Sequence, residues 1–112
     1  MSQRWGKIMW ENRMEQSFRL EGFLVQPDRN RLVLDGVETK LEPRVMRLLA
    51  TLAQRPGETV TRQALMAALW QDVHVTDDAL NRCVWKLRKA LGNEDLVETV
   101  PKLGYQIGRA HV

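Results

Sequence analysis

The sequence predicts an α+β domain in which four short antiparallel strands, three helices and a C-terminal β-hairpin follow one another. Three observations carry this prediction. Alternating apolar residues with turn signals occupy positions 18–40, apolar stripes at helical spacing occupy 43–91, and alternation returns after position 92. The 112 residues leave room for one hydrophobic core. We therefore expect one domain over residues 17–108, with an N-terminal arm at 1–16 and the start of a linker at 109–112.

The strand region shows two hairpin signals. The stretch "FRLEGFLVQ" (18–26) has two short apolar runs around Gly22, and "PDRN" (27–30) is rich in turn-forming residues. In "RLVLDGVETKL" (31–41), Asp35-Gly36 separates two alternating runs, which is a strong local signal for a hairpin. The predicted result is a four-stranded antiparallel sheet with one apolar face that later elements must cover.

Two amphipathic helices are predicted next. The first begins near Pro43, because proline is tolerated in a first helical turn, and Pro56-Gly57 ends it. Its apolar stripe consists of Val45, Leu48, Leu49 and Leu52. The second helix has Thr61 as its candidate N-cap. Its expected buried set is Leu65, Met66, Leu69 and Trp70.

The third helix spans roughly residues 76–91, with Thr76 or Asp77 as N-cap and Gly92 as terminator. Its apolar face comprises Leu80, Cys83, Val84, Leu87 and Leu91. The opposite face is polar and basic, with Asp78, Arg82, Trp85 and Lys89 at its centre and Asn81, Arg88 and Lys86 beside them. A solvated face whose C-terminal cations complement the helix dipole is one interpretation. DNA binding is the other, because Arg, Lys and Asn recognise base edges and phosphates in a major groove.

Two further observations favour DNA binding. An exposed indole such as that of Trp85 on a charged helix face indicates a binding surface. After the third helix, "LVETVPKLGYQIG" (96–108) predicts two strands around a Pro101–Gly104 turn that carries Lys102. Helix, turn, helix, basic helix and hairpin are the order of a winged helix-turn-helix. In that fold the third helix enters the major groove and the hairpin wing reaches the DNA backbone or the minor groove.

Composition excludes several other classes. The net charge of +3 suits a polyanionic partner without requiring one. Cys83 is the single cysteine, so no intramolecular disulfide can form. His74 and His111 lack the spacing of metal ligands, and we find no phosphate-cradling glycine loop and no nucleophile with a neighbouring base. We therefore expect no metal, no cofactor and no enzymatic activity. The absence of a signal peptide and of a membrane-length apolar run predicts a cytoplasmic chain.

Four landmarks carry a family resemblance: "LEPR" (41–44), "TRQALMAALW" (61–70), "VTDDALNRCVWKLRKALG" (75–92) and "ETVPKLGY" (98–105). Together they resemble the OmpR/PhoB type of winged-helix DNA-binding domain in bacterial transcription regulators. The first and last resemble the CadC/ToxR-like regulators in particular. In that group the domain is cytoplasmic, and a linker and usually a membrane span follow it. The resemblance implies an N-terminal four-stranded sheet and a double-stranded DNA partner.

The resemblance also implies roles for single residues. The base-reading positions fall on Asn81, Arg82, Trp85 and Lys86, and the DNA-backbone positions fall on Arg88, Lys89 and Lys102. It further implies homodimers on tandem half-sites and an RNA polymerase contact through the Gln71–Asp78 loop. Trp85 and Leu103 depart from the family pattern and favour an alternative, a protein-interaction winged helix that has lost DNA binding. The cations of the third helix oppose that alternative.

Overall fold

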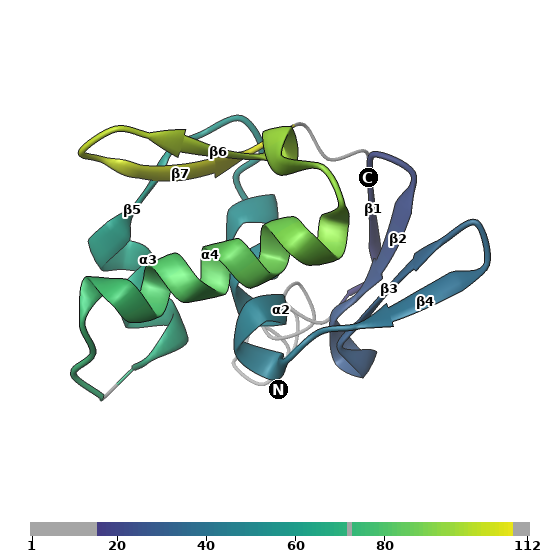
Figure 1. The fold of residues 1–112 in the computed structure, drawn as a ribbon, viewed down its shortest axis with the longest axis horizontal. Helices are drawn as coiled ribbons and strands as arrows, with labels where there is room; N and C mark the ends of the chain where they lie inside the picture. The colour runs from purple at the N-terminus through teal and green to yellow at the C-terminus, as the bar shows by residue number, and fades with distance from the viewer. Residues whose placement is uncertain (1–15, 72, 109–112) are drawn as a thin grey trace, which may run out of the picture.

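The structure, a computed structural model, describes residues 16–71 and 73–108. It begins with four strands: β1 (Phe18–Leu20), β2 (Phe23–Gln26), β3 (Arg31–Leu34) and β4 (Val37–Lys40), with the short 3-10 helix η1 (Pro27–Arg29) after β2. They form an antiparallel sheet in the order β1-β2-β3-β4, as the two hairpin signals predicted (Figure 1). The predicted arm, except for Gln16, and the expected linker at 109–112 with His111 lie outside the described residues.

Three helices follow, as expected: α2 (Pro43–Ala53), α3 (Arg62–Leu69) and α4 (Asp77–Leu91). The predicted N-cap of α3 is confirmed, because the Thr61 side chain accepts a hydrogen bond from the amide of Ala64. Gly92 ends α4 with a left-handed φ of 69°, a conformation that glycine adopts without steric cost. No helix in the described ranges is long and apolar enough to cross a membrane.

The C-terminal hairpin consists of β6 (Val97–Val100) and β7 (Gly104–Ile107), preceded by the short helix η2 (Glu94–Leu96). A third strand, β5 (Val60–Thr61), pairs with β7 and makes a sheet of order β5-β7-β6. Strand β5 was not predicted from the sequence, because two residues are too few to show alternation. The two strands can approach this closely because Gly104 has no side chain. A Cβ at this position would lie 2.0 Å from the carbonyl oxygen of Val60.

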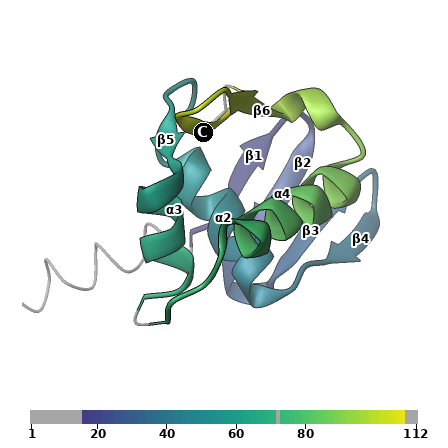
Figure 2. The same cartoon turned by 60° about the vertical axis from the view of Figure 1, so that its left-hand side comes forward.

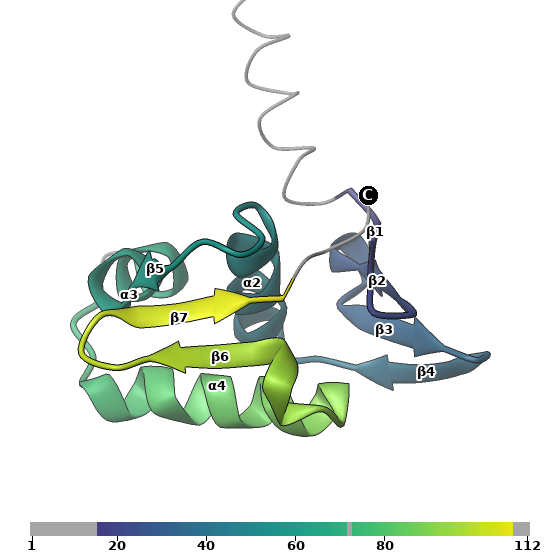
Figure 3. The same ribbon diagram turned by 90° about the horizontal axis from the view of Figure 1, so that it is seen from above.

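Helix α2 lies between the two sheets. Figures 1 and 3 show α2 in the centre, the four-stranded sheet on one side, and β5, β6 and β7 on the other. Helix α4 packs mainly on α2, and it runs along the outside of the molecule beside the hairpin, as Figure 2 also shows. The apolar stripe predicted for α2 is fully buried. In α3, Leu65, Leu69 and Trp70 are buried as expected, whereas Met66 is only partly buried.

Candidate nucleic-acid interface

Helix α4 is anchored by an apolar face and exposes a polar one. All five residues of the predicted apolar face are buried: Leu80, Cys83, Val84, Leu87 and Leu91. Burial of four aliphatic side chains and a thiol on one face fixes the rotation of the helix about its own axis. The outward face therefore has a defined orientation, and its exposed members include Asn81, Arg82, Trp85, Lys86 and Lys89.

The centre of this outward face holds a tryptophan and a lysine in contact. The side chain of Trp85 is 58% exposed, the largest exposure among the aromatic residues described. The Lys89 ammonium nitrogen lies 5.3 Å from the centroid of its ring, within the range of a cation–π contact. This pair presents an apolar surface and a positive charge at the same place. Such a surface suits a thymine methyl group next to a phosphate.

On the flank that faces α2, two cations are held loosely. Lys86 Nζ lies 2.6 Å from Glu42 Oε2 in an ion pair whose side chains are 43% and 61% exposed. Exposed pairs of this kind contribute little to stability and exchange readily with other partners. Arg82 is exposed and has no partner among the described residues. Both cations are therefore available to an incoming anion.

On the flank that faces the hairpin, Arg88 is engaged inside the domain. Its Nε and Nη2 donate to the carbonyl oxygen of Val97 at 3.0 and 2.7 Å, and Nη2 also donates to Thr99 Oγ1 at 2.8 Å. Its guanidinium carbon lies 5.9 Å from the centroid of the Tyr105 ring. These contacts tie α4 to β6. In this conformation the guanidinium turns toward the hairpin.

Asn81, on the same flank, belongs to a three-residue network. Its Oδ1 accepts hydrogen bonds from Arg62 Nη2 at 2.9 Å and from the Tyr105 hydroxyl at 3.2 Å. Arg62 Nη1 also donates to the Tyr105 hydroxyl at 2.9 Å. Arg62 was not among the site residues predicted from the sequence. It opens α3, and no periodicity or motif connects it with positions 81 and 105.

The hairpin turn presents Lys102 and Leu103 to solvent. Lys102 has a φ of 66°, in the left-handed region, and its side chain is exposed. Leu103 is 57% exposed. The turn is held from behind, because the Leu103 carbonyl oxygen accepts from the Arg62 amide at 3.1 Å. The turn is therefore attached to the same residue that orders Asn81, beside α4 (Figure 3).

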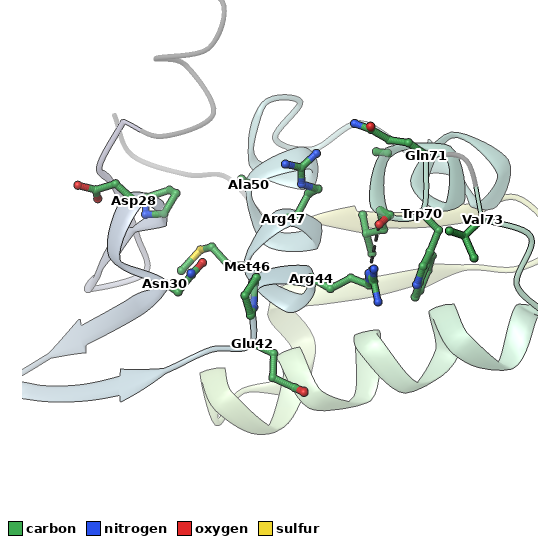
Figure 4. Close-up of a pocket in the computed structure, with 14 residues that line it drawn as sticks. Asp28, Asn30, Glu42, Arg44, Met46, Arg47, Ala50, Trp70, Gln71 and Val73 are labelled. Carbon is green, nitrogen blue, oxygen red and sulfur yellow. Dashed lines mark hydrogen bonds between the residues drawn. The ribbon is translucent and has the colours of Figure 1, made fainter.

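A separate groove of about 890 Å³ lies between α2, η1 and the end of α3. Figure 4 shows Arg44, Trp70 and Val73 along it. Arg44 Nε donates to the Leu69 carbonyl oxygen at 3.2 Å, and its guanidinium carbon stacks 5.0 Å from the centroid of the Trp70 ring. Trp70 is buried, as the sequence predicted, and so is Tyr105. The groove borders the start of the loop 71–78, of which residue 72 is not described.

Among the described residues, Cys83 is the titratable group whose pKa departs clearly from its ordinary value. Burial raises the pKa of the Cys83 thiol, although the nearby Arg44 and Lys86 charges act in the opposite direction. A thiol that stays protonated is a poor nucleophile, which fits a packing role for Cys83. Among the described residues, no three His, Cys, Asp or Glu side chains gather in a way that could hold a metal ion.

Known proteins with similar sequences and structures are transcription regulators. Residues 36–107 match the family model described as "Transcriptional regulatory protein, C terminal". The transcriptional activator CadC of Escherichia coli is 34% identical over 94 residues, which cover 80% of this chain and 18% of CadC. The phosphate regulon regulator PhoB of Pseudomonas aeruginosa is 32% identical over 82% of this chain and 42% of PhoB.

The solved structure of the DNA-binding domain of E. coli CadC is similar to this chain, with a TM-score of 0.76 and 33% identity. The match covers 85% of this chain and 94% of that domain. The chain thus corresponds to nearly the whole of that domain, but to about a fifth of the CadC protein.

Proposed function

The chain belongs to the family of transcriptional regulatory protein C-terminal domains, the OmpR/PhoB type, and from this premise we propose that it binds double-stranded DNA sequence-specifically. In this proposal it is the DNA-binding part of a bacterial transcription regulator. The observation that carries the proposal is the outward face of α4. That face keeps Arg82, Trp85 and Lys89 exposed, although the apolar face of the same helix is fully buried.

In the proposed complex, α4 lies in the major groove and the hairpin reaches the backbone or the minor groove. Asn81, Arg82, Trp85 and Lys86 then face the base edges. Lys89 and Lys102 face phosphates, which fix the register without reading sequence. For Arg88 we propose an indirect contribution, since its guanidinium already bonds to Val97 and Thr99.

The experiment that tests this function is a selection of bound sequences from a random duplex pool, followed by affinity measurements over a range of salt concentrations. We expect one enriched motif whose affinity falls steeply with salt, because bound cations release counterions from the DNA. Arg82→Ala should cost about 1–3 kcal/mol on that motif and relax the preference at one base pair. Lys102→Ala should weaken all sequences alike and reduce the salt slope by about one. If no sequence is enriched and duplex affinity does not change with salt concentration, the proposal is rejected.

A second candidate is a protein-interaction winged helix without DNA binding. The exposure of Trp85 and of Leu103, at 58% and 57%, is the observation that favours it. A salt titration of binding distinguishes the protein-interaction function from the DNA-binding function. Protein docking through these apolar side chains should survive high salt, whereas DNA binding should not.

Further parts of the proposal concern the whole regulator. We propose that residues 17–108 form the DNA-binding unit, flanked by the arm at 1–16 and a linker from 109. We also propose that two copies bind tandem half-sites, that the loop Gln71–Asp78 contacts RNA polymerase, and that the domain acts in the cytoplasm without catalysing a reaction. Support comes from the similarity to CadC, a transcriptional activator. The dimer is tested by measuring the mass of the protein–DNA complex on duplexes that carry one half-site or two. We expect one copy of the protein on the first duplex and two on the second.

A further inference from the structure

The side-chain amide of Asn81 is held in one orientation. Its oxygen accepts two hydrogen bonds, from Arg62 at 2.9 Å and from the Tyr105 hydroxyl at 3.2 Å. An amide oxygen has two lone pairs, so its capacity to accept is filled. A guanidinium carries only donors, so the group that faces Arg62 must be the oxygen and not the NH2 group. The orientation of the amide therefore follows from the chemistry of its neighbour.

The two donors are themselves fixed by the fold. Tyr105 is 5% exposed and belongs to β7. Arg62 bonds to the Tyr105 hydroxyl at 2.9 Å and to the Asp77 carbonyl oxygen at 3.2 Å, and its guanidinium carbon lies 5.6 Å from the centroid of the Tyr105 ring. The three side chains form a closed triangle that joins the starts of α3 and α4 to the hairpin. Rotation of the Asn81 amide would place its NH2 group against a cation, so the triangle opposes it.

The Nδ2 group is consequently the only part of the amide left to a ligand. Asn81 is exposed, and no acceptor among the described residues bonds to its NH2 group. A free asparagine pairs with adenine through one acceptor and one donor, the oxygen to N6–H and the NH2 group to N7. Here the acceptor is already engaged. An outward group that only donates is complementary to guanine, whose O6 and N7 are both acceptors, and is repelled by the N4 amino group of cytosine.

Building on the proposed DNA-binding function, we propose that Asn81 reads guanine by donating from Nδ2 to O6 and N7, and that Arg62 and Tyr105 are positioning residues that prevent bidentate pairing with adenine. Specificity at this position thus depends on two residues that do not face the base. Arg62 and Tyr105 are 43 residues apart in the sequence and meet only in the folded domain.

The test uses the 112-residue chain and four duplexes that carry each base in turn at one position of the selected motif. That position is the one where Asn81→Ala abolishes discrimination. For the unaltered protein we expect guanine to bind about tenfold more tightly than adenine. Asn81→Asp keeps both acceptor contacts to Arg62 and Tyr105 but turns an acceptor outward. Its preferred base should therefore change from guanine to cytosine, at lower affinity overall.

Arg62→Met tests the positioning role. It removes the donors that hold the amide, so the guanine-to-adenine ratio should fall to about one while adenine binding is retained. A role in stability alone would lower binding to all four duplexes by the same factor. Arg31→Met is the matched control, since Arg31 pairs with Glu38 in the four-stranded sheet and should leave the ratio unchanged. Circular dichroism of each variant verifies folding. If Arg62→Met does not fold, the base preferences of the unaltered protein and of Asn81→Asp still test the proposal.

The possible failures are distinguishable. A protein that binds no duplex selectively overturns both the DNA-binding function and this inference. A selective protein whose preference does not respond to Asn81→Ala overturns the inference alone. So does a preference for adenine at the Asn81-dependent position, or an unchanged preferred base in Asn81→Asp.

Discussion

The two flanks of α4 hold their polar side chains in different ways. On the hairpin flank, Asn81 and Arg88 bond to residues of other elements, among them the buried Tyr105. On the α2 flank, Arg82 has no partner among the described residues, and Lys86 has only an exposed pair with Glu42. Side chains that are already ordered lose less entropy on binding, whereas free ones can adapt to the ligand. We infer that the hairpin flank sets orientation and that the α2 flank supplies adaptable charge.

The largest effect is expected from Gly104→Ala, which would disrupt the pairing of β5 with β7 beside the hairpin flank of α4. The new Cβ would lie 2.0 Å from the Val60 carbonyl oxygen, so β5 and β7 could no longer pair as they do. We expect the free energy of unfolding to fall by about 3 kcal/mol, measured by urea denaturation. Gly108→Ala is the control, because its Cβ would meet Leu96 at an ordinary 3.8 Å. Equal, small effects of both substitutions would show that the close approach is unimportant.

Arg88→Met and Lys89→Met compare neighbouring cations, one engaged and one exposed. Loss of the Arg88 bonds to Val97 and Thr99 should lower the free energy of unfolding by about 1–2 kcal/mol. Lys89→Met should change it by less than about 0.5 kcal/mol and instead reduce the salt slope of DNA binding by about one. The reverse pattern would mean that Arg88 faces phosphate, as the family resemblance implied.

Glu42→Gln sharpens the description of the α2 flank. It removes a negative charge beside the proposed DNA surface and releases Lys86, so duplex affinity at low salt should rise about threefold. Stability should change by less than about 0.5 kcal/mol. Glu38→Gln is the matched control, since it breaks a 2.6 Å pair with Arg31 in the four-stranded sheet. A rise in affinity for both variants would indicate a general charge effect and not a local one.

The smallest effect concerns Cys83, beneath the α2 flank. Burial raises the pKa of this thiol, so the folded domain holds the proton to a higher pH than the unfolded chain does. The corresponding stability is present below the thiol pKa of the unfolded chain and is lost as pH rises toward the folded value. Urea denaturation at neutral pH and at about pH 9.5 should show a slightly smaller decline in Cys83→Ala than in the unaltered protein. An equal decline would remove Cys83 from the pH dependence.

Sequence periodicity and turn signals were sufficient to predict the three helices, the two faces of α4 and every strand except β5. The spacing of Leu80, Val84 and Leu87 predicted which side is buried, and Asp35-Gly36 predicted a hairpin that the structure contains. Both are local signals, because helix faces and tight turns depend on residues a few positions apart. The same periodicity placed Asn81, Arg82 and Lys86 on the outward side, where they are exposed.

The sequence by itself therefore determined the helix-turn-helix order, the buried face of α4 and the positive charge opposite it. Tertiary structure alone decided which of those polar groups are free. The capture of Arg88 by β6, the Arg62–Asn81–Tyr105 triangle and the approach of β5 to Gly104 all join separate elements. The paired residues lie up to 45 positions apart, as Val60 of β5 and Tyr105 of β7 illustrate. A hydrogen bond between such residues leaves no period in the chain, because its geometry exists only after the core has brought the elements together.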